Sequence, residues 1–70
     1  MNKHTMCEYL NENNEWTYFA VYKNTTNEQV LQKYAKDHGF EEEDIQIVSN
    51  GGESYLNDEV RAYSIIIETI

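Results

Sequence analysis

Few side chains of this sequence could carry out covalent chemistry, and their spacing does not bring them together. His4 and Cys7 lie three residues apart in an expected strand, so they point to opposite faces and cannot pair as base and nucleophile. His38 falls near the end of an expected helix, where the helix dipole favours a cation. The turn at 50–52 lacks the lysine and the following helix of a phosphate-binding loop. We therefore predict that the protein is not an enzyme.

Acidic side chains are concentrated in residues 37–59, which contain no lysine or arginine. Acidic and basic residues cancel elsewhere, with four of each in residues 1–36 and one of each in residues 60–70. The net charge of −8 therefore resides in one third of the chain, and charges of one sign add into a lopsided field. We predict that these acids form a partner-binding face: Asp37, Glu41, Glu42, Glu43, Asp44, Glu53, Asp58 and Glu59.

These acids do not follow the pattern of a metal or cofactor site. The run Glu41–Asp44 lacks the alternating Asp/Asn spacing, central glycine and final glutamate of a calcium loop. We predict neither a metal nor a cofactor. Binding to nucleic acid requires lysine and arginine to displace counterions. Because the chain has five basic and thirteen acidic residues, we expect no direct nucleic-acid binding.

The acids instead suit a basic partner. Alternate residues of a strand lie about 6.6 Å apart, and a nucleic-acid duplex carries one charge per about 1.7 Å of axis. Carboxylates at such separations resemble phosphates, so the face is expected to fit the basic channel of a nucleic-acid-handling protein. An acidic surface that only maintains solubility is the alternative interpretation.

Length and composition indicate a single domain over residues 1–70. The lone Cys7 cannot form an internal disulfide, which is typical of a reducing compartment. The sequence shows neither a signal peptide nor an apolar run of membrane length. We expect a cytoplasmic protein that does not bind membranes. A chain this short buries only about 60% of its unfolded surface, so a homodimer is a further expected route to stability.

Periodicity predicts one helix and four strands. The helix is expected over 27–38, because Val30, Leu31, Tyr34, Ala35 and His38 repeat at helical spacing. It begins with a capping box, either Thr26 with Gln29 or Thr25 with Glu28, and ends at Gly39. Strands are expected over 4–10, 15–23, 45–49 and 60–69. Residues 54–56 are expected to form a short turn of helix or an irregular loop.

The predicted fold class is α+β, with order β-β-α-β-β and one helix covering one face of a mostly antiparallel sheet. The favoured strand order is 1-2-4-3, with the segment 15–23 as a central strand because both of its faces are largely apolar. Strict alternation would place Trp16, Tyr18, Ala20 and Tyr22 on one face. One aromatic face then lacks a covering helix and is a candidate contact surface. The candidate aromatic anchors are Trp16, Tyr18, Tyr22 and Tyr55.

A short, acidic, single-domain chain without a catalytic motif resembles the small phage-encoded anti-defence proteins, above all the anti-CRISPR proteins. The resemblance rests on Glu41–Asp44, Glu53, Asp58 and Glu59, with the aromatic strand that contains Trp16, Tyr18 and Tyr22. It implies a non-enzymatic inhibitor in the host-cell cytoplasm that mimics nucleic acid or sterically blocks a basic groove. The implied partner is a basic protein or nucleoprotein complex.

Two other functions remain open at this point. The first is a small homodimeric structural, assembly or adaptor module that uses the uncovered aromatic sheet face. The second is an antitoxin or immunity-type inhibitor of a basic toxin or nuclease. The latter shares its physical basis with the anti-CRISPR hypothesis and differs only in the identity of the partner.

Overall fold

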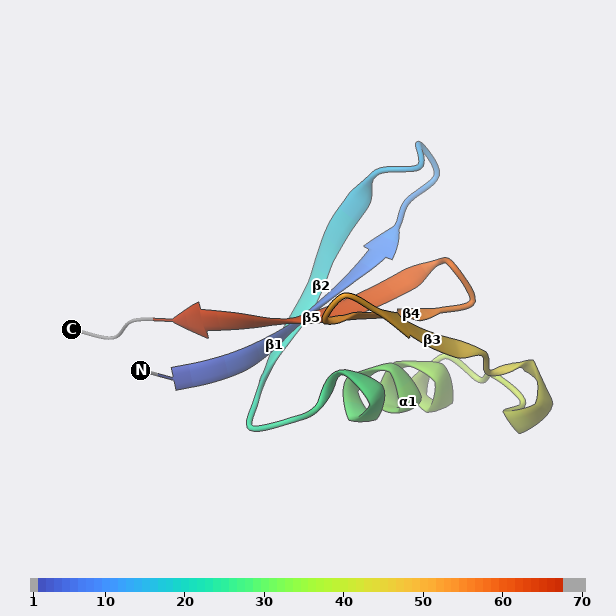
Figure 1. Cartoon of the computed structure of the whole chain (residues 1–70). Helices are drawn as coiled ribbons and strands as arrows, with labels where there is room; N and C mark the ends of the chain where they lie inside the picture. Colours follow the sequence, from blue (N-terminus) through green and yellow to red (C-terminus); the bar gives the residue numbers. More distant parts are fainter. Residues whose placement is uncertain (1, 68–70) are drawn as a thin grey trace.

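A computed structural model of the chain describes residues 2–67 and shows an α+β arrangement, with one helix packed on an open antiparallel sheet (Figure 1). Its elements are β1 (Asn2–Leu10), β2 (Trp16–Lys23), α1 (Asn27–Asp37), the 3-10 helix η1 (Glu42–Asp44), β3 (Ile47–Asn50), β4 (Glu53–Leu56) and β5 (Val60–Ile67). The predicted fold class is thus confirmed, although the number and order of the strands differ. The end of the strand expected over 60–69 lies outside the described residues.

The sheet has five strands instead of four, because residues 53–56 form β4 and not a turn of helix or a loop. Two tight turns bound this short strand. Gly51 and Gly52 have φ of 61° and 88°, and Asn57 and Asp58 have φ of 50° and 58°. Paired left-handed residues are typical of two-residue hairpin turns. The sequence signal for β4 was therefore the Asn57–Asp58 pair, which marks a second hairpin after the glycine turn.

The strand order is β2-β1-β5-β4-β3, so the predicted order and the central position of β2 were wrong. β1 pairs with both β2 and β5, and it places Cys7 opposite Ala62 at the middle of the sheet. Both side chains are fully buried. Small side chains at the sheet centre let the helix approach closely, whereas the bulky aromatic residues of β2 occupy an edge. The connection through α1 then carries the chain across the sheet to β3 at the opposite edge (Figure 1).

Helix α1 begins and ends as its sequence predicts. Thr26 is the N-cap and forms the capping box with Gln29: Thr26 Oγ1 accepts from the Gln29 backbone N–H at 3.2 Å, and Gln29 Oε1 accepts from the Thr26 N–H at 3.1 Å. After the C-cap His38, Gly39 has φ of 75°, and the Phe40 N–H donates to the Ala35 carbonyl at 2.9 Å. No helix within residues 2–67 is long and apolar enough to cross a membrane.

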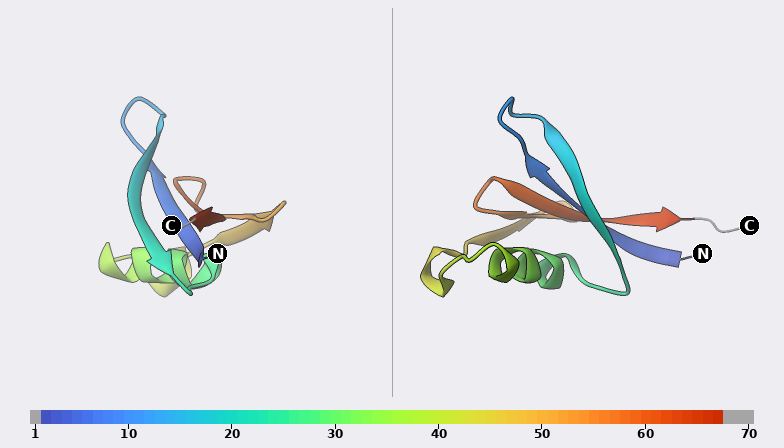
Figure 2. Two further views of the ribbon diagram at one scale, coloured as in Figure 1. Left: turned by 90° about the vertical axis from the view of Figure 1, so that its left-hand side faces the viewer. Right: turned by 180° about the vertical axis from the view of Figure 1, so that it is seen from behind.

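The hydrophobic core lies between α1 and one face of the sheet (Figure 2). Its fully buried side chains come from the helix and from β1, β4 and β5: Val30, Leu31, Ala35, Cys7, Leu56, Val60 and Ala62. No helix within the described residues 2–67 covers the other face, which we call the open face (Figure 2). The expectation of one covered and one uncovered face is confirmed.

A β-bulge in β2 changes which of its side chains reach the open face. Cys7 pairs with Ala20, but the next residue, Glu8, pairs with Tyr18, so that Phe19 is an extra residue in β2. Ala20 and Tyr22 consequently lie on the helix side, opposite Cys7 and Thr5. The predicted single face of Trp16, Tyr18, Ala20 and Tyr22 was wrong for its last two members, because strict alternation does not account for the inserted residue.

The core predicts a large difference between two apolar truncations in neighbouring strands. We expect Leu56→Ala, at a side chain that is 0% exposed, to lower the free energy of unfolding by about 2–5 kcal/mol, as truncation of a buried leucine does. Val48→Ala, at a side chain that is 61% exposed, should change it by less than about 0.5 kcal/mol. Urea denaturation followed by circular dichroism measures both. Equal stability of the two variants would contradict the assignment of the core.

Candidate protein-binding surface

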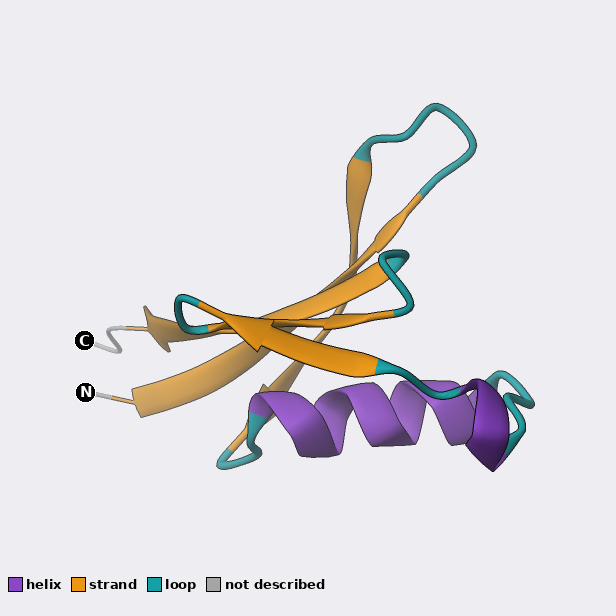
Figure 3. Ribbon diagram, turned by 45° about the vertical axis from the view of Figure 1, so that its right-hand side comes forward, coloured by secondary structure: helices purple, strands orange, loops and turns teal. Residues whose placement is uncertain are grey.

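Two acidic loops lie together at one end of the sheet. The first contains Glu41–Asp44, in η1 and its N-cap, and the second is the β4–β5 turn with Asp58 and Glu59. All six acidic side chains are exposed. Both loops lie at the end of the molecule opposite to the start of β1 and the end of β5 (Figures 1 and 3). Six of the eight predicted acids therefore share one surface.

The Asn57 side chain joins these two loops. Its Oδ1 accepts from the Gln46 backbone N–H at 2.8 Å, and its Nδ2 donates to the Asp44 carbonyl at 2.7 Å. The Asn57 backbone N–H donates to the Gln46 carbonyl at 2.9 Å. Three hydrogen bonds from one residue hold the η1 loop against the β4–β5 turn. The backbones of two loops that carry exposed carboxylates are thus fixed to each other despite the like charge of their side chains.

Two further acids belong to the same end of the sheet, although sequence analysis did not select them. Glu12 and Glu15 lie in the exposed β1–β2 turn. This turn follows Leu10, whose N–H donates to the Glu59 carbonyl at 2.8 Å. The segment count hid them, because the equal numbers of acids and lysines in residues 1–36 cancel in a sum that ignores position. We define the acidic end by its exposed side chains: Glu12, Glu15, Glu41, Glu42, Glu43, Asp44, Asp58 and Glu59.

The other two predicted acids, Asp37 and Glu53, do not belong to the acidic end. Asp37 forms an exposed i,i+4 ion pair with Lys33 at 3.0 Å. Glu53 lies in β4, where its Oε2 is 4.0 Å from a guanidinium nitrogen of Arg61 and accepts from the Tyr55 hydroxyl at 3.1 Å. Both carboxylates have basic partners within the chain. The i,i+4 spacing of Lys33 and Asp37 on the expected helix was a sequence signal for the first pair, whereas the contact of Glu53 with Arg61 depends on strand pairing.

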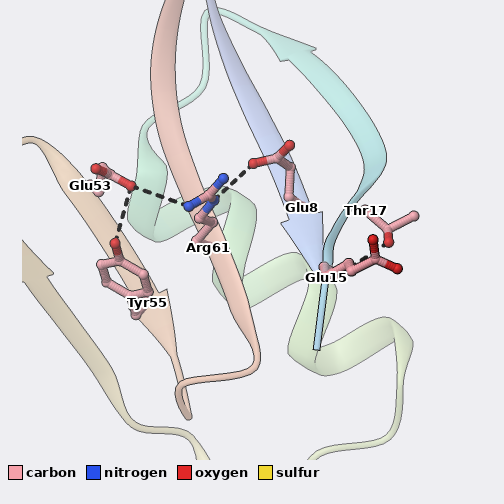
Figure 4. Close-up of polar contacts among 6 residues, drawn as sticks. All are labelled: Glu8, Glu15, Thr17, Glu53, Tyr55 and Arg61. Carbon is pink, nitrogen blue, oxygen red and sulfur yellow. Dashed lines mark hydrogen bonds and ion pairs between the residues drawn. The ribbon is translucent and has the colours of Figure 1, made fainter. Parts of the chain in front are cut away.

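Arg61 organises the open face (Figure 4). Its Nε donates to Glu8 Oε1 at 2.8 Å, and its guanidinium carbon lies 4.4 Å from the Trp16 ring centroid and 5.5 Å from that of Tyr63. The side chains of Arg61 and Glu8 are 24% and 16% exposed. Partial burial and the nearby Glu8 carboxylate raise the pKa of Tyr63. The open face therefore contains a desolvated ion pair covered by aromatic rings, which sequence analysis missed.

The predicted aromatic anchors separate into three environments. The rings of Trp16 and Tyr55 approach each other, with centroids 6.2 Å apart, across the two strands between them. Tyr18 is 61% exposed on the same face. Tyr22 faces the helix side and packs against the core, so it is not part of the open face. Trp16, Tyr18 and Tyr55 remain candidate contact residues.

The cysteine and histidine side chains that could act in catalysis or metal binding are engaged in packing or in contacts with neighbouring residues. Burial, and to a lesser extent the charge of Glu8, raises the pKa of the Cys7 thiol to about 11, so little thiolate forms near neutral pH. The His38 ring stacks on Tyr34 with centroids 3.9 Å apart, and its Nδ1 is 2.8 Å from the Tyr34 carbonyl oxygen. Within residues 2–67, no three histidine, cysteine or acidic side chains are grouped to hold a metal ion.

Comparison of the chain with protein-family models, curated proteins and solved structures finds no match. The acidic end and the open face are therefore the features of the chain that bear on its function.

The Asn57 contacts predict a local effect of one substitution. Asn57→Gly keeps a residue that tolerates the positive φ but removes both side-chain hydrogen bonds. We expect the Gln46 amide to exchange with solvent about fivefold faster or more, since a hydrogen bond contributes about 1 kcal/mol. Asp58→Gly, at the adjacent positive-φ position, is the matched control and should leave this rate unchanged. Equal rates in both variants, measured by NMR hydrogen exchange, would refute the role of the Asn57 side chain.

The Arg61 cluster predicts a global effect. Arg61→Met keeps an apolar stem but leaves the largely buried Glu8 carboxylate unpaired, so we expect a loss of about 1–3 kcal/mol in the free energy of unfolding. Adding Glu8→Gln should recover part of this loss. Lys33→Met breaks an exposed ion pair and should cost less than about 0.5 kcal/mol. Chemical denaturation monitored by Trp16 fluorescence compares these variants. If Arg61→Met were as mild as Lys33→Met, the cluster would have no structural role.

Proposed function

We propose that this protein is a non-enzymatic inhibitor whose acidic end binds a basic, nucleic-acid-binding surface of a partner protein. The observation that carries the proposal is that hydrogen bonds from Asn57 hold the two acidic loops together. Like charges repel, and a surface acid that serves only solubility has no need of a fixed neighbour. Here Asn57 makes three hydrogen bonds that hold two loops with exposed carboxylates together.

The spacing of the acidic end supports mimicry of a phosphate backbone. Its loops follow the ends of neighbouring strands, which lie about 4.8 Å apart in a sheet. Phosphates along one strand of a nucleic acid recur about every 3.4 Å. Carboxylates in several loops at one end of the sheet therefore present an extended array of negative charge on the same length scale as a phosphate backbone. A basic groove that evolved to bind phosphates would attract such a surface and be occluded by the domain behind it.

The charge distribution supports a division of roles within the surface. Long-range attraction between the acidic end and a basic groove mainly accelerates association. Affinity at an interface comes largely from packed aromatic side chains, and the exposed Tyr18 ring is available for such a contact. The proposal extends the resemblance to anti-CRISPR proteins, for which nucleic-acid mimicry and groove blocking are the implied mechanisms. A basic toxin or nuclease would offer the same type of groove.

Neutralising the acidic end tests this proposal. The variant Glu42→Gln/Glu43→Gln/Asp44→Asn removes three negative charges with little change in shape. The tagged protein captures partners from nuclease-treated bacterial lysate, and mass spectrometry identifies them. We expect a nucleic-acid-handling protein that is displaced by high salt or by added DNA or RNA. We expect the variant to bind it about tenfold more weakly, since each exposed ion pair contributes about 0.5 kcal/mol.

A charge-matched variant separates local contact from net charge. Gln32→Lys/Val48→Lys/Asn50→Lys changes the net charge by the same +3, but by adding positive charges at exposed positions outside the acidic end. It should retain most of the binding. Circular dichroism establishes that both variants are folded. Equal binding by the two variants, or capture that is insensitive to salt and to nucleic acid, would disprove the proposed role of the acidic end.

A further inference from the structure

The outer edge of β2 is an unusually long and neutral edge strand. β2 ends the sheet on one side with eight residues, whereas β3 ends it on the other with four. Trp16–Tyr22 contains no charged residue, no glycine and no proline, and only Lys23 is charged. Short length, charges and prolines are the usual means of preventing edge-to-edge pairing. β2 has few of these, apart from its final lysine and its bulge.

The bulge gives β2 a face pattern that is the same when read in either direction. Trp16, Tyr18, Val21 and Lys23 pair with open-face residues of β1, whereas Ala20 and Tyr22 pair with the buried Cys7 and Thr5. Thr17 pairs with Tyr9, and Phe19 contacts Tyr34 of the helix. Over Trp16–Lys23 the order is open, helix, open, helix, helix, open, helix, open. A regular eight-residue strand could not have this symmetry, because the side chains of its first and last residues would point to opposite faces of the sheet.

Two identical strands that pair antiparallel about a two-fold axis require a face pattern that reads the same in both directions. When two copies of one strand pair antiparallel about an axis normal to the sheet, residues opposite each other must point to the same face. With the axis between Phe19 and Ala20, β2 meets this condition along its whole length. Without the bulge, the same register would set open-face residues of one copy against helix-side residues of the other.

The side chains brought together in this register are complementary. Trp16 lies opposite Lys23 of the second copy, a pairing of an aromatic ring with a cation. Tyr18 lies opposite Val21, an aromatic and β-branched pair, and the large Phe19 lies opposite the small Ala20. No like charges oppose each other. The antiparallel arrangement also places the acidic β1–β2 turn of each copy at the Lys23 end of the other.

We propose that two copies of this chain form a two-fold dimer through antiparallel pairing of their β2 edges, with the axis between Phe19 and Ala20. The two five-stranded sheets join into one continuous sheet. Both α1 helices lie on the same face, and the two acidic ends point in opposite directions, where they do not repel each other. The η1 loop and the β4–β5 turn take no part in this contact, so the neutralised Glu42/Glu43/Asp44 variant and the β2 variants test the inhibitory function and the dimer independently.

The first test measures the mass and the effect of a charge on β2. Size-exclusion chromatography with light scattering, from micromolar to millimolar concentration, should give twice the 8.3 kDa mass of one chain. Tyr18→Glu should raise the dissociation constant by at least about tenfold, because each dimer then places two carboxylates in the interface. Val48→Glu is the matched control at a side chain of equal exposure, 61%, on the other edge strand. It should leave the dimer intact.

The second test determines the register by cross-linking. One tagged chain carries Tyr18→Cys and the other carries Val21→Cys, and the two are mixed under mild oxidation. Because these positions oppose each other, the mixture should form a disulfide-linked heterodimer. Neither variant should cross-link to itself efficiently, since its two thiols lie about 10 Å apart along the strands. The native Cys7 is buried and remains unreactive. Tyr18→Cys mixed with Val48→Cys is the negative control.

The two tests have results that support the β2 dimer and results that overturn it. A dimer that Tyr18→Glu weakens and that cross-links only in the mixture establishes the proposed interface. A monomer at every concentration overturns it, as does a dimer that Val48→Glu disrupts equally. A dimer in which Tyr18→Cys cross-links to itself as readily as to Val21→Cys overturns the register and its axis. Circular dichroism of each variant excludes loss of fold as the cause.

Discussion

The close packing of one helix on small side chains at the centre of the sheet determines the rest of the structure. Cys7 in β1 and Ala62 in β5 lie opposite each other beneath α1, and Leu31 completes the same buried cluster. A single helix can cover only part of a five-stranded sheet, and α1 contacts mainly the three inner strands β1, β5 and β4. The uncovered face and the free edge of β2 are direct consequences of this arrangement.

Electrostatics in this fold follows from which acids have partners within the chain. Glu8 and Glu53 lie beside Arg61 under aromatic rings, and Asp37 is paired with Lys33. Glu8 and Glu53 are partly buried and Asp37 is exposed but paired, whereas the acids of the three loops at one end of the sheet are exposed. The field outside the molecule arises mainly from the acidic end, where Glu12 and Glu15 take the place of the internally paired Asp37 and Glu53.

Local signals in the sequence were sufficient for the helix but not for the sheet. The Thr26 capping box, the apolar stripe and Gly39 lie within one segment, so they define α1 without knowledge of its neighbours. Strand order depends instead on long-range pairing, and the β2 bulge is visible only against β1. The acidic end was predicted in large part because most of its residues are close in sequence. Asn57 and Arg61 were missed because their roles come from residues brought near by folding.

The bulge at Phe19 links local backbone geometry to the surface that the molecule presents. An inserted residue usually blunts an edge strand by bending it. In β2 it also turns Tyr22 inward to the core and Val21 outward to the open face. Because of the same insertion, the first and last side chains of β2, Trp16 and Lys23, point to the same face of the sheet. The edge can therefore pair with a second copy of itself. A feature that protects an edge against irregular pairing can thus select a single symmetric register, because every other alignment that pairs four or more residues sets some side chains against residues that point to the opposite face.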